Sequence, residues 1–373
     1  MRILFCTPAP LMKSLGAAKV VVELAEEMQE QGWECNLVSI RDLADQSGQS
    51  MCESLRRYLQ EHAADYDVVD YDHAYLPYGR DGFNSGTLFV ARSVLLAHHL
   101  GTIQIPQSAS VKAAIGRIIK GRNRRRKYQE VICQAHTTIK EADLVNVSND
   151  DDKAELIRKG IPPEKVAVIP YGISRALRPL FDDVSSVSPE KPVVAFVGTF
   201  DYRKGAKEFP KIVHEIAEQV PDVCFRLLGG KGLFQSQKEI LSHFPKKVVQ
   251  RVEVVLKYAP EELPNLLAPC SVGVFPSYFE GMPFGVLEMM AASIPVIAYD
   301  APGPPMMLPP KYLVSRGDAK GMASKVITLL HDAVALQSAR IWAKQQSQSF
   351  LWEQIACTTI GVYQEHCRKK YRS

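Results

Sequence analysis

The stretch from Ser271 to Pro305, SVGVFPSYFEGMPFGVLEMMAASIPVIAYDAPGPP, decides the fold. It begins with SVGVF, a short apolar run that ends at Pro276 and Ser277, which predicts a buried strand. FGVLEMMAA has the composition of a helix and follows a loop that contains Gly281 and Pro283. IPVIAY is a second apolar run, and APGPP ends it. A strand, a loop, a helix and a strand in this order indicate a parallel α/β sheet.

Two carboxylates lie close to the start of the predicted helix. Glu280 lies at the mouth of the loop, and Glu288 lies one turn into the helix, eight positions later. Open α/β folds bind ligands at the carboxyl ends of their strands, and the N–H groups that begin a helix suit a phosphate. The stretch therefore predicts a phosphate-binding site beside two glutamates.

The composition is that of an ordinary globular protein with room for two domains. The chain has 373 residues, of which 46% are hydrophobic and 23% are charged. Its formal net charge of +4 is mild, so the overall charge does not imply a nucleic-acid partner.

The cysteines and the N-terminus predict a cytoplasmic location. Eight cysteines are spread singly, without the close pairs of a zinc site, which favours reduced, structural thiols. The N-terminal MRILFCTPAP begins directly with a strand and is too short an apolar run for a signal peptide. Because no stretch approaches ~20 apolar residues, we expect no membrane-spanning helix.

The first half of the chain opens with a β-loop-α-β unit. RILFC predicts a buried strand, KVVVELAEEMQEQG a helix that Gly32 closes, and CNLVSI a second strand. The small residues Gly16, Ala17 and Ala18 precede this helix. They let the backbone approach a ligand or another domain, or they serve tight packing of the helix against a strand.

The second half repeats the alternation. PVVAFVG, VCFRLLG and VEVVLKY predict buried strands, and the run from Gly205 to Val220 predicts the helix between the first two. RALRPLFDDVSSVSPEKP, which precedes the first of these strands, has the composition of a linker. Two α/β halves therefore meet near residues 175–190.

This pattern predicts an α/β fold of two Rossmann-like, doubly wound domains that face each other across a cleft. The first domain takes in residues 1–175 and the second takes in residues 176–349. The tail from Ala333 onward predicts helices with a break near residues 347–349. A last helix over residues 350–373 is therefore expected to cross back to the first domain.

The most basic window is VKAAIGRIIKGRNRRRKY, residues 111–128, whose apolar residues fall at helical spacing. A basic amphipathic helix can lie on an anionic membrane surface or meet an anionic acceptor, and it can equally be a solvated helix face. RNA is the weakest alternative, because no aromatic residues alternate with the basic ones to stack on bases.

Residues Asp70 and Asp72 frame a D-Y-D tripeptide of the kind that holds a metal in some sugar transferases. Such a tripeptide occurs often by chance, so we expect no metal site here. His98 and His99 adjoin an apolar run and are expected at the edge of the core.

Three loops of the second half follow predicted buried strands and carry polar residues that could bind a substrate. The first, GTFDYRKG, begins at Gly198, and its Arg203 and Lys204 precede the helix expected from Gly205. This pair of cations could clamp a diphosphate. Glu288 could accept hydrogen bonds from ribose hydroxyls, whereas Glu280, nearer the loop tip, would face a sugar.

Taken together, these features make the sequence resemble the family-4 retaining glycosyltransferases of the GT-B fold. The likeness covers most of the chain and is most specific in the E-x7-E region formed by Glu280 and Glu288 and in the closing helix. The segments that carry it are RILFCTPAP with GAAKVVVELAEEMQEQGWECNLVS, ADLVNVSNDDDKAELIRKGIPPEKVAVIPYGIS, VVAFVGTFDYRKG, PEELPNLLAPCSVGVFPSYFEGMPFGVLEMMAASIPVIAYDAPG and SFLWEQIACTTIGVY.

The resemblance implies that the second domain binds a nucleotide-sugar donor. Glu288 would hold the ribose, and Glu280 with the backbone of the following residues would hold the donor sugar. Arg203 and Lys204 would stabilise the departing nucleoside diphosphate. The remaining implied donor contacts are Gly281, Met282, Pro283, Phe284 and Gly285 around the sugar, Lys257 and Tyr258 near the base, Gly198 in the phosphate loop, and Gly16 at the diphosphate from the first domain.

The resemblance further implies retention of configuration and catalysis without a cofactor or metal ion. The acceptor would be a glycan or a lipid-linked molecule in polysaccharide or envelope glycan synthesis. The expected location is cytoplasmic, with a peripheral position on the inner face of a membrane left open.

Three positions depart from the family. Ala17 follows Gly16 where the family usually has a second glycine, and Ser293 stands where it often has glycine. Pro304, Pro305 and Met306 follow Gly303 where a glutamate is usual. The family's first-domain histidine has no clean match, and Arg92, His98 and His99 are its candidates. The altered loop from Gly303 to Met306 leaves room for an alternative, a catalytically silent partner protein of the same fold that only binds a nucleotide sugar.

Overall fold

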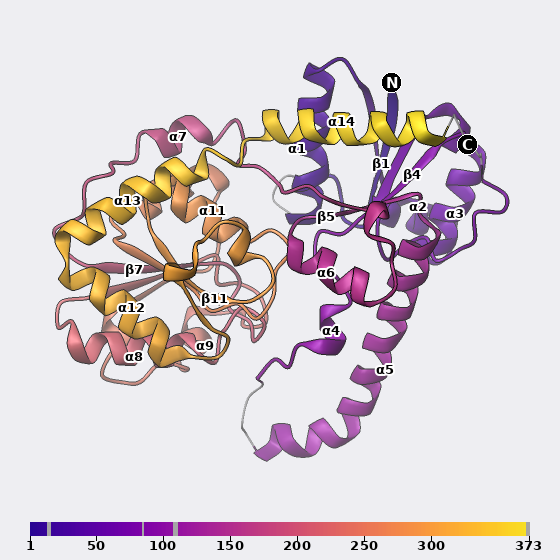
Figure 1. Ribbon diagram of the computed structural model, residues 1–373. Helices are drawn as coiled ribbons and strands as arrows, with labels where there is room; N and C mark the ends of the chain where they lie inside the picture. Colours follow the sequence, from indigo (N-terminus) through magenta and orange to yellow (C-terminus); the bar gives the residue numbers. More distant parts are fainter. Residues whose placement is uncertain (13–15, 84–85, 107–110, 371–373) are drawn as a thin grey trace. The chain divides into compact units, whose positions relative to one another are not determined.

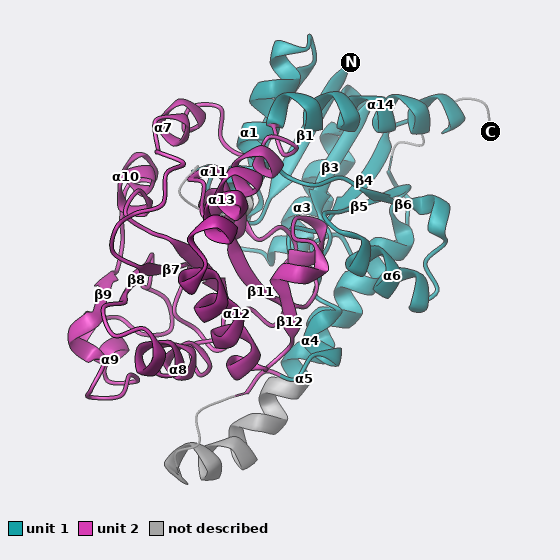
Figure 2. Cartoon of the chain, turned by 60° about the vertical axis from the view of Figure 1, so that its left-hand side comes forward, with its two compact units in different colours: residues 1–104, 110–172, 352–373 teal, residues 105–109, 173–351 magenta. Residues whose placement is uncertain are grey.

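The computed structural model describes residues 1–12, 16–83, 86–106 and 111–370, and it describes no side chains for residues 16–17 and 111–125. The chain divides into two compact units (Figure 2). Unit 1 consists of Met1–Gln104, Ser110–Gly172 and Trp352–Ser373, and unit 2 of Ile105–Ala109 and Ile173–Leu351.

Unit 1 is built on a parallel six-stranded sheet in the order β2-β1-β3-β4-β5-β6 (Figure 1). Its strands are short apolar runs, as expected where helices cover both faces of a parallel sheet. They are β1 (Arg2–Thr7), β2 (Glu34–Ser39), β3 (Val68–Asp72), β4 (Leu88–Arg92), β5 (Leu144–Val147) and β6 (Val166–Val168).

Seven helices among the described residues belong to unit 1. They are α1 (Gly16–Glu30), α2 (Ile40–Ser47), α3 (Met51–His62), α4 (His99–Thr102), α5 (Val111–Glu141), α6 (Asp150–Arg158) and α14 (Trp352–Lys370). The last of these, α14, lies beside α1 (Figure 1), and the Trp352 indole donates a 2.7 Å hydrogen bond to the carboxylate of Glu23. The last helix of the chain therefore completes the unit that the first residues begin.

Unit 2 is built on a second parallel six-stranded sheet, in the order β12-β11-β10-β7-β8-β9. The strands are β7 (Val193–Val197), β8 (Cys224–Leu228), β9 (Val252–Val255), β10 (Val272–Phe275), β11 (Val296–Asp300) and β12 (Leu313–Ser315). The chain runs outward from β7 to β9 and then returns to β10 on the other side of β7. The strand order therefore reverses between β7 and β10, where open α/β sheets bind ligands.

The described helices of unit 2 flank this sheet. They are α7 (Arg178–Asp182), α8 (Phe209–Gln219), α9 (Gln237–Leu241), α10 (Leu263–Leu267), α11 (Phe284–Ala291), α12 (Ala319–His331) and α13 (Ala333–Ser347). Helix α8 packs against α12, and α11 packs against α13. Two parallel sheets with flanking helices confirm the predicted α/β class with two Rossmann-like domains.

The helix predicted from Gly205 to Val220 is present as α8, but it begins four residues later than predicted, at Phe209. Gly205 has a positive φ of 87°, and a Cβ atom there would lie 2.5 Å from the carbonyl oxygen of Pro276. The loop after β7 is therefore longer than expected and is pressed against the loop after β10, which keeps Arg203 and Lys204 off the helix.

The segment predicted as a linker is bound to unit 2. It contains α7, and the buried Arg340 of α13 donates hydrogen bonds to the carbonyl oxygens of Ser185, Ser186 and Cys270. Its Ser188 also bonds Gln337 on α13. Composition suggested flexibility, but long-range contacts hold the segment.

Helix α2 was not predicted, because the run CNLVSI predicts a strand that ends at Ile40, and Ile40 is the first residue of the helix. Ser39 ends β2 and also caps the helix, its hydroxyl oxygen accepting a hydrogen bond from the N–H of Asp42. A serine followed three positions later by an acidic residue was the signal that could have revealed it.

Candidate functional site

The loop after β7 is shaped by its own hydrogen bonds. The carboxylate of Asp201 accepts a 2.7 Å bond from the hydroxyl of Thr199 and a 3.0 Å bond from the N–H of Lys204. The carbonyl oxygen of Arg203 accepts a 2.8 Å bond from the N–H of Tyr278 in the loop after β10. The two loops are thus joined at the point where the strand order reverses. Asp201 was missed as a site residue, although it lies inside the predicted phosphate loop.

Arg203, Lys204 and Glu280 form one charge cluster, called the charge triad below, in which Glu280 is buried and the two cations are half-buried. The Oε1 atom of Glu280 lies 2.7 Å from Nη1 of Arg203 and 2.8 Å from Nζ of Lys204. Only 6% of Glu280 is exposed. Two cations face one carboxylate, so the triad carries a net positive charge at the mouth of the sheet.

Burial alone would raise the pKa of Glu280, but the ammonium of Lys204 and the guanidinium of Arg203 outweigh it and lower this pKa to about 2. Burial tends to lower the pKa of Arg203, and the Glu280 carboxylate raises it overall. Glu280 and Arg203 are therefore both charged at neutral pH. The sequence placed Glu280 at the sugar and the cations at the diphosphate, whereas the structure brings the three together.

Ser277 is a further member of this site that sequence reasoning missed. Its side chain is fully buried, and its hydroxyl donates a 2.6 Å hydrogen bond to Oε1 of Glu280. Gly303 closes the other side, since a Cβ atom there would lie 3.0 Å from Cβ of Glu280. Gly303, which begins the segment that departs from the family, thus packs directly against Glu280 of the charge triad.

The start of α11 lies against the end of β7. A Cβ atom on Gly285 would lie 2.6 Å from the carbonyl oxygen of Val197, and one on Gly198 would lie 3.2 Å from Cδ of Lys204. Both glycines therefore allow close approach, although Gly285 stands in a helix and Gly198 in a loop.

Several of the backbone N–H groups at the start of α11, which were expected to be available to a phosphate, are bonded within the loop and the helix. The N–H of Phe284 bonds the carbonyl oxygen of Met282, and those of Val286 and Leu287 bond Pro283. These bonds limit the donors that α11 can offer to an anion, so the side-chain cations carry more of the site's positive character.

Glu288 belongs to a second cluster on the same side of the sheet. The Tyr258 ring covers Gly229 at the end of β8, where a Cβ atom would lie 3.3 Å from Cε1 of the ring. Burial and the Glu288 carboxylate raise the pKa of Tyr258. Glu288 therefore lies near enough to act electrostatically on Tyr258, whereas Lys257 is exposed.

In unit 1, the three candidates for the missing histidine are all buried. Arg92 donates to Asp70 at 2.6 Å and to the hydroxyl of Tyr363 on α14 at 2.9 Å. His99 lies 2.7 Å from Oδ1 of Asp152, and His98 lies 3.4 Å from Nδ1 of His136. Arg92 and His99 are therefore each held by a buried carboxylate, that of Asp70 and that of Asp152.

Two predicted features lie at the limit of the described residues. Gly16 begins α1, but its surroundings fall outside them, as do the side chains of residues 111–125 in the basic segment. Among the described residues, no group of three or more His, Cys, Asp or Glu side chains could hold a metal ion. In the same part of the chain, no helix is long and apolar enough to cross a membrane.

This chain is similar to known glycosyltransferases. Residues 191–332 match the family model for glycosyl transferases group 1. The sulfoquinovosyl transferase SQD2 of Arabidopsis thaliana is 25% identical over 47% of this chain, a match that spans only 33% of that protein. The D-inositol 3-phosphate glycosyltransferase of Corynebacterium diphtheriae is 25% identical over 82% of this chain and 72% of its own length.

Solved structures show the same fold over the whole chain. HepE of Anabaena, solved in complex with UDP, has a TM-score of 0.67 at 17% identity and covers 98% of this chain and 100% of its own. At this identity the likeness concerns the fold alone. The fold, the matched segment and the relatives together confirm the predicted resemblance of this chain to the glycosyltransferases of the GT-B fold.

Proposed function

We propose that this protein is a retaining hexosyltransferase that moves a sugar from a nucleoside-diphosphate sugar to a glycan or lipid-linked acceptor. The observation that carries the proposal is the charge triad, in which two half-buried cations are held on one carboxylate at the strand reversal between β7 and β10. A net positive site at that place suits a diphosphate leaving group.

In this proposal the second domain, residues 176–349, binds the donor, and the first domain, residues 1–175 with the last helix, provides the acceptor side. Glu288 accepts hydrogen bonds from the ribose, and Tyr258 lies near the base with Lys257. Gly198, Gly281, Met282, Pro283, Phe284 and Gly285 line the diphosphate and sugar, and Gly16 approaches from the first domain. The UDP bound to HepE supports testing UDP-sugars first.

Catalysis is electrostatic in this scheme. As the anomeric C–O bond breaks, negative charge grows on the departing diphosphate, and Arg203 and Lys204 offset it in place of a metal ion. Glu280, held by Ser277, keeps both cations in position and lies nearest the transferred sugar. The acceptor hydroxyl then attacks the anomeric carbon on the same face and passes its proton to an oxygen of the departing diphosphate, so the configuration is retained.

The decisive experiment is a turnover assay with purified variants and a panel of UDP-, GDP- and ADP-sugars. Removing the ammonium in Lys204→Ala is expected to lower kcat by about 10²–10³-fold, the usual effect of losing one group that stabilises a developing charge. Glu288→Ala is expected to raise KM for the donor, because it loses the ribose contact. The exposed Lys191→Ala serves as the matched control.

Full activity in both site variants would overturn the assignment. Calorimetry on the same proteins separates the alternative function. Donor binding without transfer or hydrolysis, in the wild type as well, would identify a catalytically silent partner protein.

A further inference from the structure

Unit 2 contains a cavity of about 430 Å³ that is lined by α12, by α13 and by the short 3₁₀ turn of Pro310–Tyr312 before β12. This volume lies in the range that holds a small organic ligand. We call it the α12–α13 cavity. None of the residues that line it is a proposed donor contact, so the donor site leaves this cavity without a role.

The wall of the α12–α13 cavity is largely apolar. Ile297 of β11 and Ala339 of α13 are buried, and Leu329 of α12 is half-buried. Tyr312 is only 5% exposed, and its ring packs on that of Trp342 with the centroids 4.8 Å apart. A ligand with an apolar body would therefore gain by covering this wall.

Two lysines supply the charged groups of the lining. The ammonium of the half-buried Lys325 donates hydrogen bonds to the carbonyl oxygens of Lys311 and Leu313, at 2.7 Å and 2.9 Å. Nζ of Lys311 lies 4.9 Å from the centroid of the Tyr312 ring. Over the part of the chain that the structure describes, neither lysine forms an ion pair with a carboxylate. The apolar wall is thus bordered by positive charge.

The acidic residues at the starts of the two helices do not line the cavity. Asp318 caps α12, its carboxylate accepting a 2.8 Å hydrogen bond from the N–H of Gly321. Asp332 caps α13 in the same way, at 2.9 Å from the N–H of Ala335. Both carboxylates are therefore engaged with helix N-termini, where a negative charge is stabilising.

Two hydroxyls of the lining add hydrogen-bond donors. Those of Tyr312 and Ser324 form no hydrogen bond with another described residue, whereas those of Thr328 and Ser338 donate to carbonyl oxygens of their own helices. Burial raises the pKa of Tyr312, so its hydroxyl keeps its proton at neutral pH. Lys311, Tyr312 and Ser324 are therefore the groups that an anion in the cavity would use.

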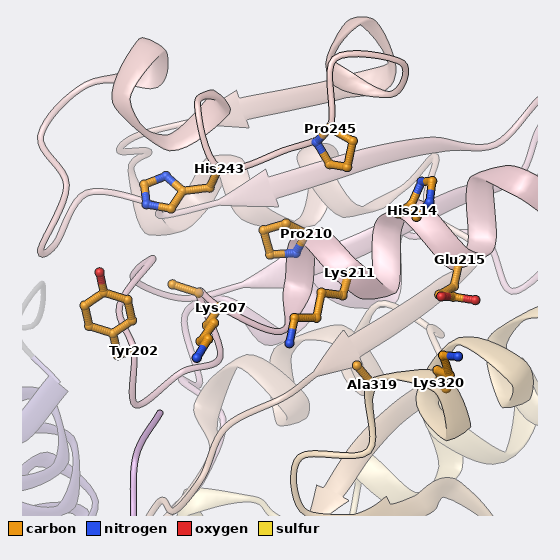
Figure 3. Close-up of a pocket in the computed structure, with 11 residues that line it drawn as sticks. Tyr202, Lys207, Pro210, Lys211, His214, Glu215, His243, Pro245, Ala319 and Lys320 are labelled. Atoms are coloured by element: carbon orange, nitrogen blue, oxygen red, sulfur yellow. The ribbon is translucent and has the colours of Figure 1, made fainter. Parts of the chain in front are cut away.

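A further cavity of unit 2, of about 470 Å³, lies beside α8 and also contains lysines (Figure 3). There Glu215 is part of the lining, and Lys207 and Lys211 act electrostatically on the carboxylate of Glu208. The α12–α13 cavity differs from it because lysines are the charged residues of its lining.

We propose that the α12–α13 cavity binds a fatty acid, with the alkyl chain on the apolar wall and the carboxylate at Lys311. An ammonium group forms charge-assisted hydrogen bonds with carboxylate oxygens, and the hydroxyls of Tyr312 and Ser324 add donors to them. The alkyl chain removes the apolar wall from water. This site is separate from the charge triad and does not rest on the proposed transfer reaction.

Calorimetry with the full-length protein tests this site, using decanoate below its micellar concentration as the probe. Decanol carries the same chain without the charge, and butyrate carries the charge on a short chain. Decanoate should bind at least tenfold more tightly than either control. Equal affinity for decanol would overturn the role of the lysines, and equal affinity for butyrate would overturn the role of the apolar wall.

Variants show where decanoate binds. Lys311→Gln should weaken decanoate binding about tenfold, because one charge-assisted hydrogen bond is lost, and should leave decanol binding unchanged. Ala335→Phe, which fills the cavity, should weaken the binding of both. Lys191→Gln, which changes an exposed lysine outside the cavity, should bind decanoate like the wild type. Thermal unfolding checks that all variants are folded.

A variant of the donor site separates this proposal from the proposed function. Lys204→Ala should bind decanoate like the wild type, and a loss of binding in this variant alone would assign the carboxylate to the charge triad and overturn the proposal. Absence of decanoate binding, or binding that both cavity variants leave unchanged, would also overturn it.

Discussion

At the scale of single residues, Ser293 shows how a family departure is accommodated. It has a φ of 61°, a left-handed conformation in which it stands alone among the described non-glycine residues. Its side chain is fully buried, and its hydroxyl has no hydrogen-bond partner there. The backbone at this position thus keeps the geometry that glycine adopts without strain, although the sequence supplies serine.

Ser293→Gly is therefore expected to stabilise the protein. Relief of the left-handed strain and removal of a buried, unbonded hydroxyl should together outweigh the backbone entropy of glycine by about 1 kcal/mol. For a domain of this size, the melting temperature should rise by about 2–4 °C in differential scanning calorimetry. Ser293→Ala, which removes the hydroxyl and keeps the strain, is the control. A glycine variant no more stable than the alanine variant would contradict the role given to the backbone.

At the scale of elements, side chains from several segments of unit 1 form a buried histidine cluster. His98, between β4 and α4, faces His136 of α5, and the cluster includes His73 after β3 and His99, which pairs with Asp152 of α6. Burial, followed by the nearby charges of His73, His136, Lys159 and His99, lowers the pKa of His98 to about 3. This residue is therefore neutral in the folded protein through the whole physiological range.

This depressed pKa makes unit 1 sensitive to acid. Below pH 6.5 the unfolded chain protonates His98 and the folded chain does not, so stability falls as the pH drops from 6.5 towards 3. Relative to His98→Gln, the wild type should lose about 3 kcal/mol of unfolding free energy between pH 6.5 and 4. Urea unfolding across this pH range measures it. The control variant His62→Gln changes an exposed histidine, and its unfolding free energy should vary with pH as that of the wild type does. If the unfolding free energy of His98→Gln also varies with pH as that of the wild type does, the lowered pKa of His98 is contradicted.

At the scale of the whole molecule, the basic segment over residues 111–128 bears on where the protein works. It falls within α5, and its sequence carries eight lysines and arginines. An anionic membrane surface attracts such a segment by about 1 kcal/mol for each charge near it. A lipid-linked acceptor and a peripheral position on the inner face of a membrane would both agree with this attraction.

Flotation with liposomes tests the membrane contact. Replacing Arg124, Arg125 and Arg126 with glutamine should reduce binding to phosphatidylserine-containing vesicles by about a hundredfold, because three charges are lost. Vesicles of phosphatidylcholine alone should bind neither protein. Equal flotation of the wild type and the variant on anionic vesicles would leave the segment as a solvated helix face.

The sequence by itself predicted most of the strands, though not β12, as well as the order of the α/β halves and the three loops that carry polar groups. It could do so because the strands of a covered parallel sheet are continuous apolar runs, and because Gly and Pro mark where they end. The local pattern was less reliable where a contact from far along the chain intervened. The sequence predicted that a helix begins at Gly205, but in the structure Gly205 packs against Pro276 and lies in the loop before the helix.

Only the tertiary structure decided how the site residues combine. Lys204 and Glu280 are 76 positions apart, and they meet because β7 and β10 are neighbours in the sheet. Strand order follows from the packing of the whole unit, which no local pattern encodes. The same packing buries Ser277 against Glu280 and turns two separately predicted groups into one charge triad. The sequence therefore indicated which residues could form the site, whereas the partners of each charged residue could be identified only from the fold.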